Sequence, residues 1–172
     1  MQFVEVPLAR GSLFLSLRPG YPKIGKIDEK ILADYIGEVK HRKIGLVVVL
    51  MTSEEIQQKC GIDIIAHYRS EGFEVFHFPI DDHEPPLDVD LFDQLQQLIW
   101  NHLQNRNVLI HCNAGCGRTG TVAAGLLIHS GKAKTVKGAI TTMRKYKPCA
   151  VETTGQEDFL EAYLNRVQNK KA

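Results

Sequence analysis

One short stretch of the chain combines a thiol, a guanidinium and three glycines: HCNAGCGRTG, residues 111–120. Cys112 and Arg118 are six positions apart, and no bulky side chain lies between them. A cysteine thiolate is a strong nucleophile, and an arginine fork can bind two phosphate oxygens at once. The stretch is therefore either a tight turn in which both residues are incidental, or a phosphate-binding loop with a nucleophile at its floor.

The elements on either side of this stretch favour the second interpretation. Residues 107–111 (NVLIH) predict a short buried strand, and a largely apolar helix is predicted from near Arg118 to His129. Between them, Gly115 and Gly117 allow successive backbone N–H groups to turn toward one point. The N-terminus of the helix adds unpaired amides and the positive end of its dipole, so that an anion is favoured there. The predicted phosphate-binding residues are Asn113, Ala114, Gly115, Cys116, Gly117 and Arg118.

Cys112 lies in the same positive field, which favours its thiolate form and makes it the predicted nucleophile. Thr119 is expected to donate its hydroxyl to the sulfur, with ordinary helix capping as the alternative. His111 precedes the nucleophile on the predicted strand, so we expect a structural role in which it hydrogen-bonds to the loop backbone. A Walker A loop is not present, because its Gly-Lys-Ser/Thr is absent.

Strand and helix signals alternate along the rest of the chain. Strands are expected at 12–17, 44–51 and 73–78, and helices at 28–42, 88–104, 135–146 and 154–167, with a further helical stretch beginning after Thr52. Residues 79–88 (PIDDHEPPLD) are expected to be irregular, because three prolines interrupt them. This alternation predicts an α/β fold, a three-layer sandwich with a central, largely parallel twisted sheet flanked by helices.

Length and composition are those of an ordinary globular protein. The 172 residues are expected to form a single domain, 1–172. A net charge of +1 gives no support for a nucleic-acid partner. The longest aliphatic run, residues 46–51, is far too short to span a membrane, and the N-terminus lacks the pattern of a signal peptide. We therefore expect a cytoplasmic monomer without a membrane partner.

Four cysteines need a separate interpretation: Cys60, Cys112, Cys116 and Cys149. Nothing else indicates secretion, and no Cys-x-x-Cys pair completes a zinc site, so no metal is expected. Cys60 and Cys149 are predicted to be reduced, structural thiols. Cys116 is either a plain small side chain or the partner of Cys112 in a reversible disulfide that forms under oxidation.

The stretch HCNAGCGRTG resembles the signature of the cysteine-dependent protein tyrosine phosphatase superfamily, which is His-Cys, five residues, then Arg-Ser/Thr. The short chain looks like the small atypical dual-specificity branch, with bacterial and archaeal members. The resemblance extends from about residue 44 to the C-terminus. It implies the phosphatase fold and a catalytic role for Cys112, Arg118 and Thr119.

Two further segments fit the resemblance. In PIDDHEPP, residues 79–86, Asp82 corresponds to the general acid of the family, with Asp81 as the alternative because the same proline spacing fits it. In KPCAVETTGQEDF, residues 147–159, Gln156 corresponds to the glutamine that positions water, with a solvent-facing helix position as the alternative. Glu152 in this segment is a weaker candidate for a contact with the loop or with Arg118.

The resemblance implies a metal-independent phosphomonoester hydrolase that needs no cofactor. Its partners would be phosphorylated proteins, with phosphotyrosine and also phosphoserine or phosphothreonine as substrates, and its intermediate a phosphocysteine. Two alternatives stay open. One is a phosphatase of a non-protein substrate such as an inositol phospholipid, an RNA end or a phosphoglucan, although inositol-lipid phosphatases usually carry a lysine where Cys116 stands. The other is a non-catalytic phosphate-binding module.

Overall fold

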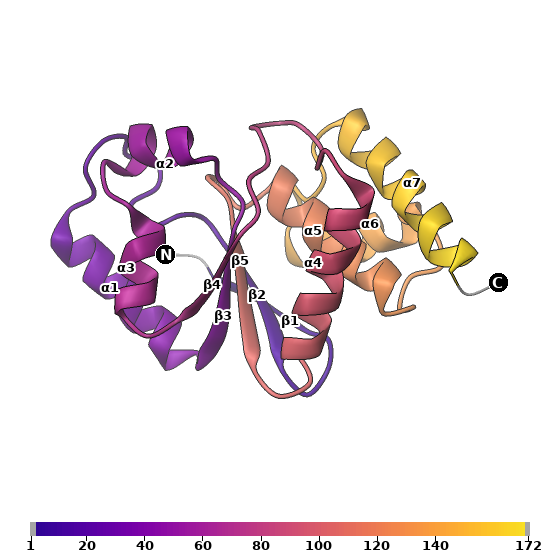
Figure 1. Cartoon of the computed structure of the whole chain (residues 1–172), viewed down its shortest axis with the longest axis horizontal. Helices are drawn as coiled ribbons and strands as arrows, with labels where there is room; N and C mark the ends of the chain where they lie inside the picture. Colours follow the sequence, from indigo (N-terminus) through magenta and orange to yellow (C-terminus); the bar gives the residue numbers. More distant parts are fainter. Residues whose placement is uncertain (1–2, 171–172) are drawn as a thin grey trace. The chain divides into compact units, whose positions relative to one another are not determined.

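The computed structural model describes residues 3–170 of the chain (Figure 1). The chain divides into two compact units. The first unit runs to Pro79 and includes His102–Gly115, and the second comprises Ile80–Asn101 and the chain from Cys116 onward. The expectation of a single phosphatase domain stays a prediction.

The first unit contains a five-stranded sheet in the order β1-β2-β5-β3-β4. Its strands are β1 (Phe3–Pro7), β2 (Ser12–Ser16), β3 (Ile44–Val49), β4 (Glu74–His77) and β5 (Asn107–His111). The β2–β5, β5–β3 and β3–β4 pairs are parallel, and β1 pairs with β2 in the antiparallel sense at one edge. β5 is therefore the central strand, and its carboxyl end leads into the loop that carries Cys112.

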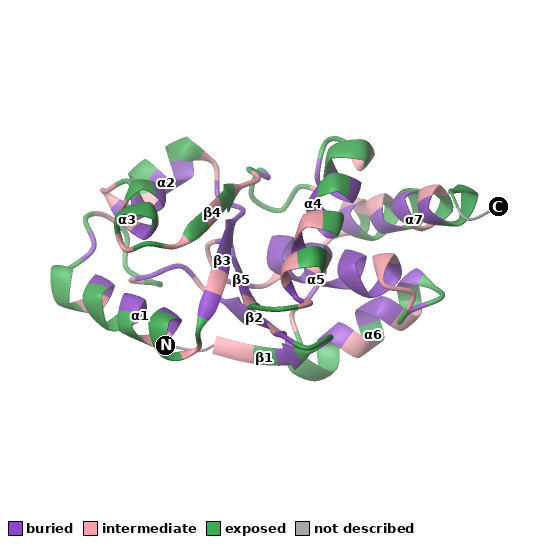
Figure 2. Cartoon of the chain, turned by 60° about the horizontal axis from the view of Figure 1, so that its bottom comes forward, coloured by how far each residue is buried: buried purple, intermediate pink, exposed green. Residues whose placement is uncertain are grey.

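Three helices belong to the same unit: α1 (Glu29–His41), α2 (Ser53–Cys60) and α3 (Ile64–Ser70). Asp28 begins α1 by accepting the backbone N–H groups of Lys30 and Ile31. The apolar face of α1, including Tyr35 and Val39, shares one buried core with residues of the strands such as Val47 (Figure 2). This core fixes the strands, and with them the position of the chain at the end of β5.

The second unit is helical and is built around α5. Its helices are α4 (Val89–His102, of which His102 belongs to the first unit), α5 (Gly117–His129), α6 (Val136–Tyr146) and α7 (Thr154–Asn169). Nearly every residue of α5 is buried, and α6 and α7 both contact it. Gly125 lets α5 approach α4 closely, since a Cβ there would lie 2.6 Å from the Phe92 ring. Such burial fits the largely apolar sequence of α5, although its first turns also bury Arg118, Thr119 and Thr121.

The mixed α/β class and the largely parallel sheet are confirmed. Residues 79–88 form neither helix nor strand, as predicted from their prolines. Two elements were missed, because β1 is a short edge strand that ends in Pro7 and α3 spans only seven residues, too few for a periodic signal. Within residues 3–170, no helix combines the length and the apolar character needed to cross a lipid bilayer.

Candidate active site

In the first unit, Cys112 directly follows the last residue of β5 and is almost completely buried. Its thiol is free, and its sulfur accepts a hydrogen bond from the backbone N–H of Gly115 over 3.2 Å. Gly115 has a φ of +68°, and a Cβ there would lie 2.4 Å from the carbonyl oxygen of Ser16. Only glycine satisfies both conditions, so this glycine is what allows the loop to turn its amide toward the thiol.

Arg18 holds the residue next to the nucleophile, and the sequence did not indicate this role. Its Nε donates to the Oδ1 atom of Asn113 over 2.9 Å, and its backbone N–H donates to the Asn113 carbonyl over 3.0 Å. The guanidinium is buried and also donates to the carbonyls of Pro19 and Lys23. All of these acceptors are uncharged amide oxygens. Arg18 therefore fixes the residue after the nucleophile through side-chain and backbone hydrogen bonds at once.

His111 is fully buried and contacts the loop backbone, as the sequence predicted. Its Nδ1 lies 3.1 Å from the Cys112 carbonyl, and its Nε2 lies 3.1 Å from the Tyr68 hydroxyl. Burial raises the pKa of Tyr68 well above its usual value, so the hydroxyl stays protonated and can donate to Nε2. A carbonyl only accepts, so Nδ1 carries the imidazole proton. Both ring nitrogens therefore face partners inside the first unit, which agrees with the predicted structural role of His111.

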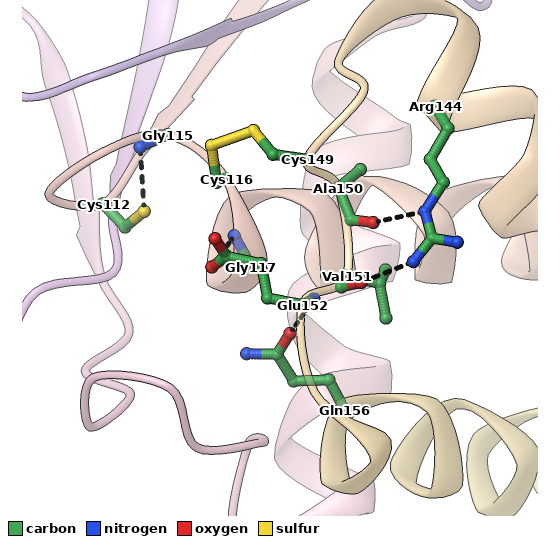
Figure 3. Close-up of a disulfide and its surroundings, with 10 residues drawn as sticks. All are labelled: Cys112, Gly115, Cys116, Gly117, Arg144, Cys149, Ala150, Val151, Glu152 and Gln156. Carbon is green, nitrogen blue, oxygen red and sulfur yellow. Dashed lines mark hydrogen bonds between the residues drawn. A yellow bond between two sulfur atoms is a disulfide. The ribbon is translucent and has the colours of Figure 1, made fainter.

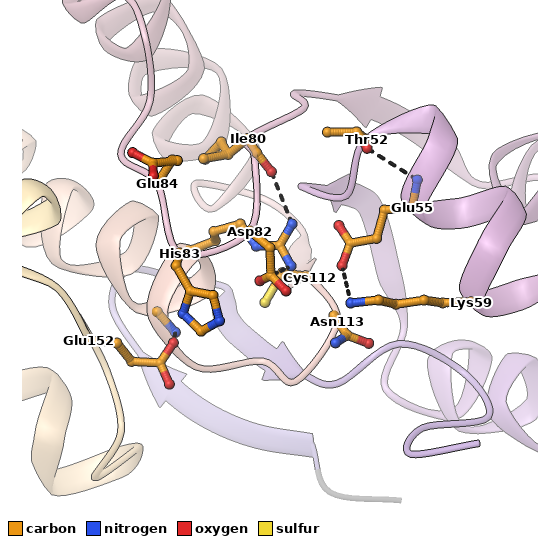
Figure 4. Close-up of polar contacts among 12 residues, drawn as sticks. Thr52, Glu55, Lys59, Ile80, Asp82, His83, Glu84, Cys112, Asn113 and Glu152 are labelled. Carbon is orange, nitrogen blue, oxygen red and sulfur yellow. Dashed lines mark hydrogen bonds and ion pairs between the residues drawn. The ribbon is translucent and has the colours of Figure 1, made fainter. Parts of the chain in front are cut away.

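In the second unit, Arg118 is the second residue of α5 and is buried. Its Nη1 donates to the carbonyl of Ile80 over 2.9 Å, and its Nη2 donates to the Oδ1 atom of Asp82 over 2.8 Å (Figure 4). Asp81 is exposed and makes no such side-chain contact. The structure therefore brings Asp82, and not Asp81, to the arginine, while its role as the general acid stays a prediction.

Gln156 lies on α7 and is completely buried, which excludes the solvent-facing alternative. Its Oε1 accepts the backbone N–H of Glu152 over 2.9 Å, and its Nε2 donates to the carbonyls of His83 and Glu84 over 3.5 and 3.4 Å. These bonds connect α7 to the segment that carries Asp82. The predicted water-positioning role of Gln156 stays a prediction.

Thr119 is also buried, and its Oγ1 has no hydrogen-bond partner within residues 3–170. A buried hydroxyl without a partner is costly to keep in a protein interior. This hydroxyl is available as a donor, and its predicted hydrogen bond to the Cys112 sulfur stays a prediction.

A disulfide joins Cys116 to Cys149, with the two Cα atoms 5.2 Å apart (Figure 3). The prediction that Cys149 is a reduced structural thiol is therefore wrong, and so is the hypothesised pair of Cys116 with Cys112. The physical reason is Gly120, where a Cβ would lie 2.6 Å from the Cα of Ala150. Without that Cβ, the chain after α6 can approach the start of α5 and bring Cys149 to Cys116.

Cys60 is free and buried, as predicted, and burial raises the pKa of its thiol. Glu152 contacts the loop through its carboxylate, which accepts the backbone N–H of Gly117 over 2.8 Å. This contact was anticipated only as one of two alternatives. Gly117 is the first residue of α5, so its amide has no partner inside the helix.

The model of the family described as "Polymorphic toxin system, DSP-PTPase phosphatase" matches residues 25–132, which is more than half of the chain and includes the whole His-Cys to Arg-Thr signature. The chain therefore belongs to this family. Its predicted membership of the protein tyrosine phosphatase superfamily, in the branch of small dual-specificity enzymes, is confirmed.

The chain is also similar to individual proteins and to solved structures. An uncharacterized protein of Methanocaldococcus jannaschii is 37% identical over 124 residues, which are 71% of this chain and 72% of that protein. Cyclin-dependent kinase inhibitor 3 of Rattus norvegicus is 28% identical over 131 residues, or 76% of this chain and 62% of the rat protein, so the match spans less than two thirds of that relative. The crystal structure of Tk-PTP in the active form superposes with a TM-score of 0.73 at 26% identity, covering 95% of this chain and 97% of the other.

Proposed function

We propose that this protein is a metal-independent phosphomonoesterase that hydrolyses phosphotyrosine, phosphoserine and phosphothreonine in proteins through a phosphocysteine intermediate. The observation that carries the proposal is the free Cys112 thiol at the carboxyl end of the central parallel strand, with the Gly115 amide directed at its sulfur. The carboxyl ends of parallel strands are where ligands bind in open α/β sheets. An amide N–H that donates to the sulfur stabilises the thiolate, the form that attacks phosphorus.

In the first step, the Cys112 sulfur attacks phosphorus in line and the bond to the leaving oxygen breaks. The equatorial oxygens are held by the loop amides and the Arg118 fork, which carry the charge stabilisation. Asp82 donates its proton to the leaving oxygen. Asp82 contacts Arg118 over 2.8 Å, so a phosphate that binds this arginine displaces the carboxyl group and makes it available for proton transfer.

In the second step, Gln156 positions a water molecule and the ionised Asp82 accepts one of its protons. The water oxygen attacks the phosphocysteine, inorganic phosphate leaves, and the Cys112 thiolate is restored. Thr119, whose buried hydroxyl has no partner in the described part of the chain, donates this hydroxyl to the sulfur as the sulfur leaves. Activity is expected to depend on pH as a bell-shaped curve, because the first step requires an ionised thiol and a protonated Asp82 at the same time.

The test is the turnover of a substrate panel in EDTA by the wild type and by Cys112→Ser. The panel contains an aryl phosphate, phosphotyrosine and phosphothreonine peptides, and an inositol-phospholipid headgroup. We expect hydrolysis of the aryl phosphate and of the peptides, with a loss of at least about 10³-fold in Cys112→Ser. Cys60→Ala is the matched control, because it removes the other free thiol and should leave turnover unchanged.

Each other result changes the assignment. Loss of turnover in EDTA would contradict the metal-independent mechanism. Hydrolysis of the inositol headgroup alone would make the protein a phosphatase of a non-protein substrate. Phosphopeptide binding without any turnover would make it a phosphate-binding module.

A further inference from the structure

The first amide of α5 is already occupied by a carboxylate. Gly117 donates its N–H to the Oε2 atom of Glu152 over 2.8 Å, as Figure 3 shows. This amide belongs to the proposed phosphate-binding loop, and the positive end of the helix dipole lies beside it. Glu152 therefore takes a place that an oxygen of the phosphate group would otherwise occupy.

The segment that carries Glu152 is held by three separate contacts. The disulfide fixes Cys149, three residues before Glu152, to Cys116, the residue directly before Gly117. Arg144 donates to the carbonyls of Ala150 and Val151 over 3.1 and 2.8 Å. The side chain of Gln156 accepts the backbone N–H of Glu152 over 2.9 Å. The disulfide therefore links the chain just before the Gly117 amide to the chain just before the Glu152 carboxylate.

The backbone of this segment is in an unfavourable conformation. Val151 has a φ of +60°, in the left-handed region that β-branched residues rarely adopt. Such a residue persists only where the surrounding contacts impose its conformation. We therefore attribute the position of Glu152 to the contacts that hold the segment rather than to a local preference of the chain.

A second carboxylate occupies the neighbouring donor, since Asp82 contacts Arg118 over 2.8 Å. Asp82 has a proposed use in catalysis once it is displaced, whereas the proposed mechanism assigns no step to Glu152. A phosphate dianion and the Glu152 carboxylate cannot share one amide, and like charges at that distance repel each other. Phosphate binding therefore requires that Glu152 leave Gly117.

We propose that Glu152 sets the phosphate affinity of this site as a built-in competing anion, and that the Cys116–Cys149 disulfide keeps it in place. This inference rests on the proposed function. Reduction by a dithiol transfers two electrons and two protons, so that Cys116 and Cys149 become thiols and the dithiol becomes its own disulfide. The segment is then held only by Arg144 and Gln156, so Glu152 leaves Gly117 more readily and the amide becomes available to phosphate. Cys112 takes no part in this exchange.

The test measures the binding of inorganic phosphate by calorimetry, in full-length protein that carries Cys112→Ser. This background keeps oxidation of the nucleophile out of the measurement. We expect Glu152→Gln to bind phosphate about tenfold more tightly than the parent, because one competing charge is removed. Glu161→Gln is the matched control, since it removes the same charge from an exposed position on α7 and should leave the affinity unchanged.

The role of the Cys116–Cys149 disulfide is tested by adding dithiothreitol, which reduces it, and separately by Cys149→Ser, which removes it. Each should tighten phosphate binding several-fold when Glu152 is present and have no effect in the Glu152→Gln protein. The inference is overturned if Glu152→Gln binds phosphate no better than Glu161→Gln, or if no variant binds phosphate. It is also overturned if breaking the disulfide has the same effect with and without Glu152. Failure of the proposed function is distinct, because it would appear as an absence of turnover while these affinity differences persist.

Discussion

The two halves of the signature loop are held by opposite kinds of contact. Residues 112–115 are fixed by hydrogen-bond donors, among them the buried guanidinium of Arg18 and the Gly115 amide. Residues 116–118 are fixed by two carboxylates, those of Asp82 and Glu152, and by a disulfide. The contacts of the first half that are named here include no carboxylate. Those of the second half occupy donors that the proposed function assigns to the phosphate group.

This difference separates two kinds of expected effect. A substitution that loosens the first half should misplace the thiol and lower kcat, because catalysis depends on its alignment with phosphorus. A substitution that removes a carboxylate from the second half should change the affinity for phosphate. The predictions below test this division, beginning with the largest expected loss of activity.

Arg118→Lys should lower kcat/KM by about 10³-fold, because lysine provides a point charge where the account requires a planar fork with two donors. Arg144→Lys is a comparison at a second arginine of the same unit, which bonds to backbone carbonyls instead of to the proposed phosphate. Steady-state kinetics with an aryl phosphate would measure both. A loss of less than tenfold in Arg118→Lys would remove the arginine from the phosphate-binding role.

Arg18→Met should lower kcat by about 10- to 100-fold with little change in KM, because Asn113 would lose its hydrogen bond and the loop its alignment. Methionine is chosen because its side chain is also long but carries no positive charge. Arg10→Met removes the same charge at an exposed position and should leave kcat unchanged.

A second measurement separates alignment from a general loss of stability. The rate at which iodoacetamide alkylates Cys112 in the folded Arg18→Met protein should differ from the wild-type rate at the same pH, because the loop that holds the thiol loses the hydrogen bond between Arg18 and Asn113. If kcat falls in proportion to the unfolded fraction and the alkylation rate is unchanged, Arg18 is only a structural residue.

Thr119→Val should leave the free energy of unfolding unchanged or slightly higher, because it replaces a buried hydroxyl that has no partner among residues 3–170 by a methyl group of similar size. If the hydroxyl serves the leaving sulfur, the rate of phosphocysteine breakdown should fall about 10-fold. Thermal unfolding and pre-steady-state kinetics would measure the two effects separately. A destabilised variant with normal kinetics would show that the hydroxyl has a structural partner instead.

Asp93→Asn tests a polar cluster outside the loop and should leave kcat within about twofold of the wild type. Burial alone would raise the pKa of Asp93, but hydrogen bonds from Lys170 and Tyr163 and the charges of Lys170 and His129 hold it below its usual value. The stabilisation is therefore present above the unfolded pKa near 3.9 and is lost as pH falls through the folded pKa.

At pH 7 this variant should lose about 2 kcal/mol of unfolding free energy. Urea unfolding of both proteins at pH 7, 5 and 3.5 would show whether the difference narrows in acid. A difference that stays constant across this range would contradict the charge-based explanation.

Local features of the sequence predicted much of the site. β5, the glycine-bearing loop and the start of α5 follow from a strand run, a signature and an apolar helix that are contiguous in the chain. The family resemblance of residues 79–86 favoured Asp82 over Asp81, although the proline spacing fits both, and the structure places Asp82 on Arg118. In each case the signal and the element lie within a few residues of each other.

The features that were missed depend on residues far apart in the sequence. Arg18 and Asn113 are separated by 95 positions, and the paired cysteines by 33. Neither contact leaves a periodic or spacing signal, because both arise only when separate elements pack together. Gly120 permits the disulfide because it lets Ala150 approach α5 closely. From the sequence alone, a glycine in a helix does not indicate which segment will pack against it.

The most direct test of the account is to trap the covalent intermediate. The enzyme would be mixed with an aryl phosphate, quenched with acid within milliseconds, digested and examined by mass spectrometry. The account predicts a phosphoryl group on Cys112 in the wild type, and more of it in Gln156→Ala, where water attack is slowed. Rapid turnover by the wild type with no phosphorylated Cys112 at any quench time, in either protein, would contradict it.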